Sequence, residues 1–147
     1  MTLTVDTVLV PVDGTDASAT AAEYAVTVAD RYDANAHALY VLGETVTRAI
    51  ETGDVAEDDV VEETNTFLGE VEDLAPDGVT VDSSIAYGFS TSRKLQHPGS
   101  VILDAAEDVD ADFLVVPREG MRGDAGDVLE KAAEYVLLYA SQPVLSV

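Results

Sequence analysis

Short apolar runs alternate along the whole chain with longer segments whose apolar residues recur at helical spacing. The runs at residues 7–12 and 113–116 are rich in β-branched residues and almost continuously apolar, which is typical of strands buried on both faces of a sheet. We expect strands at residues 7–12, 37–42, 79–86, 113–116 and 144–147. We expect helices at residues 15–33, 60–75, 98–109 and 129–140, with Thr15 or Asp16 as the first cap, and a loop at residues 44–54.

This alternation of strand and helix predicts one α/β domain over residues 1–147 with a parallel sheet covered by helices on both faces. Ligands bind such sheets at the carboxyl ends of the strands, near the point where the strand order reverses. The loops that follow Val12, Leu42, Ala86 and Val116 are therefore the candidate site. The run at residues 79–86 alternates only partly between polar and apolar residues, which favours a more exposed edge strand.

The chain is strongly acidic, with 29 Asp and Glu against 7 Lys and Arg and a net charge of −22. Nucleic acids and anionic membranes are excluded as partners, because both require clustered basic residues. An acid-rich, Lys-poor composition is typical of an extreme halophile and predicts a fold that requires salt. We interpret the densest acidic run, residues 57–63, as a solvated helix face rather than a metal site, since metal binding needs convergent ligands.

Motifs that would indicate an enzyme are missing from the sequence. There is no cysteine, and no Walker, zinc-protease or nucleophile-elbow pattern is present. The serines at positions 18, 90 and 92 have no evident partner, and we interpret His37 as a core or interface residue. We therefore expect no catalytic residues and no metal. No secretory leader or membrane-length apolar run is apparent, so we expect a cytoplasmic protein.

Four segments resemble universal stress protein domains. Residues 8–18, VLVPVDGTDAS, resemble the family's opening strand, its Pro-Val-Asp-Gly-Ser/Thr turn and its Ser-bearing helix. Residues 112–116, 134–137 and 142–145 look like its fourth strand, last helix and closing strand. The resemblance implies a flavodoxin-like or Rossmann-like, adenine nucleotide alpha hydrolase-like, three-layer sandwich with a five-stranded parallel sheet.

The resemblance also implies a homodimer that pairs through the last strand. The residues concerned are Pro143, Val144, Leu145 and Val147. An apolar terminal strand with an unpaired edge is a liability unless it is covered, so dimerisation has a physical rationale as well. A further protein partner is also compatible with such a module.

Many family members bind ATP through a motif of Gly, two residues, Gly, nine residues and Gly-Ser or Gly-Thr. In this sequence the frame falls on Pro117, Gly120 and the pair Glu130-Lys131. Proline has no amide N–H to donate, and a carboxylate ~4 Å from a phosphate costs on the order of 4 kcal/mol at an effective dielectric near 20. We therefore expect a degenerate motif and no cofactor, with ATP and Mg²⁺ as the disfavoured alternative.

Six residues match the family's nucleotide positions or lie in the altered loop: Pro11, Asp13, Val41, Gly120, Arg122 and Gly123. The glycines are equally explained by turn geometry. We interpret residues 88–97, with Arg93, Lys94 and His97, as a surface loop, the alternative being contact with an anion or an acidic partner.

Two functions follow from the sequence. The first is a dimeric regulatory or interaction module of the stress response. The alternative is an adenine-nucleotide sensor or weak ATPase that uses Arg118, Arg122, Lys131 and the Arg93–Lys94 loop in place of the missing glycines. Flavin-dependent electron transfer has only an analogy of fold behind it.

Overall fold

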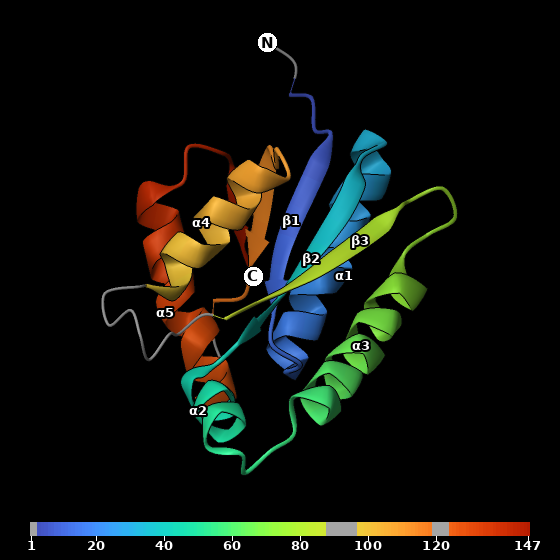
Figure 1. The fold of residues 1–147 in the computed structure, drawn as a ribbon. Helices are drawn as coiled ribbons and strands as arrows, with labels where there is room; N and C mark the ends of the chain where they lie inside the picture. The colour runs from blue at the N-terminus through green and yellow to red at the C-terminus, as the bar shows by residue number, and fades with distance from the viewer. Residues whose placement is uncertain (1–2, 88–96, 119–123) are drawn as a thin grey trace.

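The structure, a computed structural model, describes residues 3–87, 97–118 and 124–147, with side chains except at 44 and 124–131. Its five strands form one parallel sheet in the order β3-β2-β1-β4-β5 (Figure 1). The strands are β1 (Thr7–Val12), β2 (Asn35–Leu42), β3 (Val81–Tyr87), β4 (Phe113–Val116) and β5 (Val144–Ser146). The helices are α1 (Asp16–Tyr32), α2 (Glu44–Thr52), α3 (Glu57–Leu74), α4 (Pro98–Asp108) and α5 (Asp124–Tyr139). The expected parallel α/β sheet is confirmed.

The sheet lies between two helical layers. Alternate residues of β1 enter different cores: Val8 and Val10 pack with α1 and α3, whereas Leu9 packs with α4 and α5. Small side chains let α1 lie close to the sheet, and its buried alanines are Ala21, Ala22, Ala25 and Ala29. Because β1 pairs with both β2 and β4, the strand order reverses beside β1, which is where a parallel sheet opens a ligand site.

The prediction of a loop at residues 44–54 is wrong, because most of that segment is α2. Val46, Ala49 and Ile50 recur at helical spacing, but three apolar residues in a short segment give a weak helical signal. Gly53 is the residue that ends α2. Its φ of +81° is in the left-handed region that glycine adopts at little cost.

The two edge strands of the sheet are β3 and β5. The prediction that residues 79–86 form an exposed edge is confirmed, since every β3 side chain is exposed or half-buried. Among the described residues, no helix combines the length and the apolarity that crossing a membrane requires.

Candidate functional site

Asp13 follows β1 directly, at the point where the strand order reverses, and its side chain is only 7% exposed. One oxygen, Oδ1, accepts hydrogen bonds from the backbone N–H of Thr15 at 3.1 Å and from its hydroxyl. The other, Oδ2, is buried without a hydrogen-bond partner among the described residues. An unsatisfied buried acceptor costs free energy, so Oδ2 is available to a hydroxyl or N–H group of a ligand.

The turn after Asp13 is built by the start of α1. Thr15 caps the helix by accepting a hydrogen bond from the N–H of Ser18 at 3.2 Å, which confirms the predicted cap. The Ser18 hydroxyl in turn accepts from the N–H of Asp13 at 3.2 Å and donates to the carbonyl of Thr15 at 2.9 Å. These bonds hold the Asp13 carboxylate beside the positive end of α1.

Tyr40, near the end of β2, holds the other side of the same turn. Its hydroxyl donates to the carbonyl of Asp13 at 3.1 Å, and its ring meets Phe67 edge to face at 5.9 Å. Burial raises the pKa of Tyr40, and the nearby carboxylates of Asp13 and Glu63 raise that pKa further, so the hydroxyl stays a donor at neutral pH. Gly14, at a φ of +84°, is required here because an added Cβ would lie 2.7 Å from the Tyr40 oxygen.

A cavity of about 340 Å³ opens beside Asp13, between the ends of β1 and β2 and the helices α2 and α3. This volume is at the lower end of the roughly 300–1,000 Å³ typical of small-molecule sites. Its walls are mostly apolar, with Val41, Val46, Ala49, Val55 and Val60 among the lining residues. The segment that follows Leu42 was predicted to be part of the site, but as a loop, and its helical form was not predicted.

The charge of this cavity is one-sided. Asp13 and Glu63 both line it, and none of the described residues that line it is Lys, Arg or His. The arrangement favours a ligand that brings hydrogen-bond donors and disfavours an anion, whose charge the two carboxylates would repel.

The structure brings together those predicted nucleotide-site residues that it describes. Pro11 and Asp13 lie at the end of β1, Pro11 is in register with Leu39 of β2, and Val41 is buried and lines the cavity. Gly120, Arg122 and Gly123 lie outside the described residues.

The segment that follows β4 is described only at its start. Pro117 is buried, and the N–H of the exposed Arg118 donates to the carbonyl of Val147 at 2.7 Å. This hydrogen bond joins the residues that follow β4 to Val147, the residue directly after β5.

Of the predicted interface residues, Pro143 is exposed, and Val144, Leu145 and Val147 are half-buried. Strand β5 pairs with β4 on one side, and no described strand pairs with its other side.

His97 is the residue that caps α4, where we had expected only a loop side chain. Its Nδ1 accepts a hydrogen bond from the N–H of Gly99 at 3.0 Å, so this nitrogen carries no proton in the observed arrangement. Its ring stacks on Tyr135 of α5 at 4.4 Å. An imidazole that accepts is compatible with a helix start, where a cation would be unfavourable. Arg93 and Lys94 lie outside the described residues.

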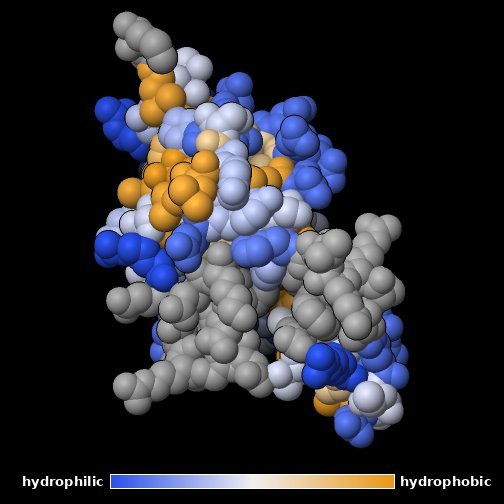
Figure 2. All heavy atoms as spheres, turned by 90° about the vertical axis from the view of Figure 1, so that its left-hand side faces the viewer, coloured by the Kyte–Doolittle hydropathy of each residue, from blue (hydrophilic) through white to orange (hydrophobic). Residues whose placement is uncertain are grey.

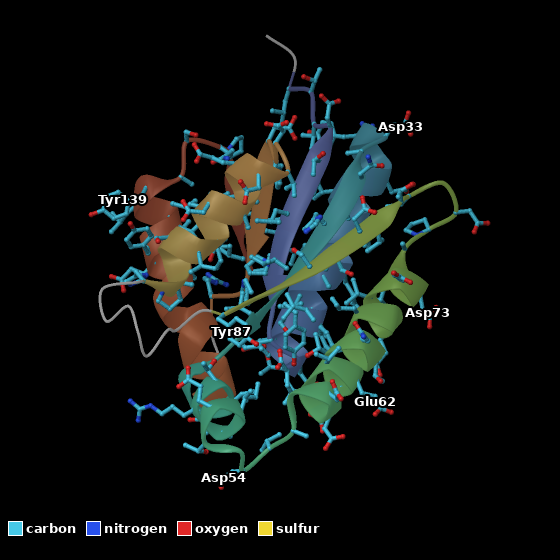
Figure 3. The ribbon with its side chains drawn as sticks, in the orientation of Figure 1. Asp33, Asp54, Glu62, Asp73, Tyr87 and Tyr139 are labelled. Carbon is cyan, nitrogen blue, oxygen red and sulfur yellow. The ribbon has the colours of Figure 1, made fainter. Side chains whose placement is uncertain are left out.

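The acidic run at residues 57–63 forms the first turns of α3, and its acidic side chains are exposed. Glu62 within this run and Asp73 further along the same helix point away from the sheet (Figure 3). No group of three acidic or histidine side chains that would hold a metal ion occurs within the part of the chain that is described.

Sequence reasoning missed several residues of the cavity, chiefly Tyr40, Glu63 and Thr64. Tyr40 offers one signal, a hydroxyl in the otherwise apolar stretch at residues 38–42. The contributions of Glu63 and Thr64 depend on how α3 packs against β2, which no local pattern reports.

Comparison with known proteins gives a consistent result. The model of the Universal stress protein family matches residues 4–147. A universal stress protein of Methanocaldococcus jannaschii is 28% identical over 144 residues, covering 95% of this chain and 80% of that protein. A universal stress protein solved in complex with cAMP has a TM-score of 0.67 at 22% identity, covering 99% of this chain and 98% of that one. One from Archaeoglobus fulgidus in complex with dAMP has a TM-score of 0.62 at 21% identity, covering 99% and 98%.

Proposed function

Since the chain belongs to the universal stress protein family, we propose that it is a dimeric, cytoplasmic regulatory or interaction module of the stress response. In this proposal it turns over no substrate and has no phosphate cradle for ATP. One observation carries the last point. Pro117 has no N–H, and the N–H of Arg118 is already donated to Val147, so the first two residues after β4 offer no free backbone donor to a phosphate.

Electrostatics supports the same conclusion. A phosphate tail that enters at the carboxyl ends of the strands would approach a cavity lined by Asp13 and Glu63 and by no described cation. Each carboxylate at ~4 Å from a phosphate charge costs on the order of 4 kcal/mol at an effective dielectric near 20. Glycine-rich loops succeed because backbone N–H groups and a helix N-terminus compensate that charge.

Calorimetry with ATP in molar KCl, with and without Mg²⁺, tests the proposal. We expect no saturable ATP binding, and submicromolar binding would overturn the proposal. The triple variant Pro117→Gly, Glu130→Gly, Lys131→Ser restores the family's glycines and hydroxyl, and it should create or strengthen ATP affinity. The single variant Lys131→Ser is the matched control, because it removes a cation without restoring a glycine and should not create ATP affinity.

A second candidate is an adenine-nucleotide sensor that binds through the β1–β2 side of the site. The cavity and the unpartnered Oδ2 of Asp13 favour it, and two proteins of similar fold were solved with cAMP and with dAMP. Calorimetry with AMP and with adenosine tests it, and Asp13→Asn should weaken any binding. Ultraviolet absorbance of the purified protein above that of its tyrosines would show a nucleotide already bound. Flavin-dependent electron transfer predicts FMN binding, which the same calorimetry detects.

A further inference from the structure

A second group of reactive side chains lies on β2 and β3, and none of its members lines the Asp13 cavity. His37 Nε2 is 2.8 Å from the hydroxyl oxygen of Ser84, and both residues are half-buried. His37 is in register with Asp82 on the neighbouring strand. Side chains two residues apart on a strand share a face, so Asp82 and Ser84 lie on the same face of β3 as Ala86, which packs with α4 and α5.

The protonation state of His37 suits it to accept a proton. Burial lowers its pKa below the ordinary value of 6.5, although the carboxylate of Asp82 raises the pKa in part. The ring is therefore uncharged at neutral pH, with one nitrogen free to accept. A hydroxyl within hydrogen-bond reach of a neutral imidazole is the arrangement that activates serine as a nucleophile.

The outer side of β3 supplies a backbone donor next to the hydroxyl. The N–H of Ala36 donates to the carbonyl of Thr80 at 2.9 Å, which sets the alternation of the β2–β3 ladder. In a parallel pair, only alternate residues of a strand bond to a given neighbour. The even-numbered residues of β3 therefore bond to β2, and the odd-numbered ones, including Ile85, direct their N–H groups away from β2. No described strand lies on that side. The N–H of the residue after a nucleophile is a recurring donor to the oxyanion of acyl transfer.

We propose that Ser84 is an acylation site, activated by His37, that takes an acyl group from activated acyl donors such as aryl esters. The Ser84 oxygen attacks the carbonyl carbon while its proton passes to His37 Nε2, and the Ile85 N–H faces the developing oxyanion. The bond to the aryl oxygen then breaks, and the leaving group departs with the bonding pair as a phenolate. His37 releases its proton to solvent, and the acyl group remains as an ester on Ser84.

The test uses p-nitrophenyl acetate and the intact chain in molar KCl near neutral pH. We expect release of one equivalent of p-nitrophenolate and one acetyl group on Ser84, located by peptide mass mapping. Ser84→Ala should abolish this labelling. His37→Asn should slow it by roughly 10²–10⁴-fold, the usual contribution of a general base. Acetyl groups found only on lysines or the N-terminus, or an unchanged rate in His37→Asn, would overturn the proposal.

Two further variants separate activation of Ser84 from a merely structural pair. Ser83→Ala is the matched control, because Ser83 is a neighbouring exposed serine on the other face of β3, and the rate should not change. Asp82 is a positioning residue, and Asp82→Asn should move the pH–rate profile to lower pH, since its carboxylate raises the His37 pKa.

If circular dichroism shows that Ser84→Ala does not fold, Ser84→Cys provides a second readout. We expect iodoacetamide to alkylate the Ser84→Cys variant faster when His37 is present than when it is combined with His37→Asn. Equal alkylation rates would count against the proposal.

Discussion

The two edges of the sheet differ in length and chemistry. Strand β3 pairs with β2 over seven residue positions, and Asp82, Ser83 and Ser84 lie in it. Strand β5 pairs with β4 over three positions, and no side chain from Tyr135 to Val147 is charged. In a chain with a net charge of −22, an uncharged edge is where a second copy can approach without like charges meeting. The β3 edge carries polar groups that water can bind, and the β5 edge is the one that the proposed dimer would cover.

The surface around β5 extends this contrast onto α5. Seen from the α4–α5 side, apolar side chains gather in the upper half of the molecule, over the C-terminal end of α5 (Figure 2). Leu137 is 52% exposed and Leu138 is 71% exposed. At the β3 edge, by contrast, the exposed Tyr87 donates a hydrogen bond to Glu57 at 3.4 Å, and Ile85 contributes to a second cavity of about 210 Å³. The apolar side chains of that edge already have neighbours on α3.

The strongest test removes one outward-facing N–H from each edge. The N–H of Val147 donates to Val116, so the alternating ladder directs the N–H of Ser146 outward, as it does for Ser83 on β3. We expect Ser146→Pro to convert a dimer into a monomer, because proline cannot donate to a partner strand. Ser83→Pro is the matched control and should leave the dimer intact. Analytical ultracentrifugation in molar KCl measures both, and a dimer that persists in Ser146→Pro would exclude pairing through β5.

A smaller effect is expected when charge is placed beside β5. Leu138→Glu should weaken the dimer by about tenfold, which is roughly 1.4 kcal/mol, because the two copies would bring like charges together. Leu74→Glu, at the far end of α3 and itself 41% exposed, should leave the dissociation constant unchanged. Equal weakening by both variants would mean that general repulsion, and not the α5 surface, controls association.

A higher salt concentration should strengthen both the association of two copies and the stability of each folded chain. Two bodies of charge −22 repel over a Debye length of about 10 Å at 0.1 M salt but only about 3 Å at 1 M. We therefore expect the dimer to tighten and the free energy of unfolding to rise from low to molar KCl. Sedimentation and chemical unfolding at the two concentrations measure these changes. An unfolding free energy that does not rise with KCl would contradict the predicted requirement for salt.

The sequence predicted the sheet well because the strands carry local signals. The predicted bounds of β1 and β4 coincide with the observed ones, since nearly continuous apolar runs indicate burial on both faces. The cavity could be predicted only in part. Asp13 and Val41 are fixed by their strands, but α2 is too short for its periodicity to stand out. The His37–Ser84 pair joins residues 47 positions apart, and only the register of β2 with β3 brings them together.

The smallest expected effect concerns pH and His37, on the strand next to the β3 edge. Burial lowers the pKa of His37 in the folded state, so the unfolded chain takes up its proton first as the pH falls. The stability that follows from this shift is fully present above pH ~6.5, the unfolded value, and it is lost as the pH falls from there towards the lowered folded pKa. His37→Asn removes the titrating group, so its unfolding free energy should fall less than that of the wild type between pH ~7 and the folded pKa. Urea unfolding of both proteins across that interval measures the difference, which isolates His37 because the carboxylates of the two proteins are the same. Parallel curves would mean that the Asp82 carboxylate offsets the burial of His37 completely, so that the pKa of His37 does not change on folding.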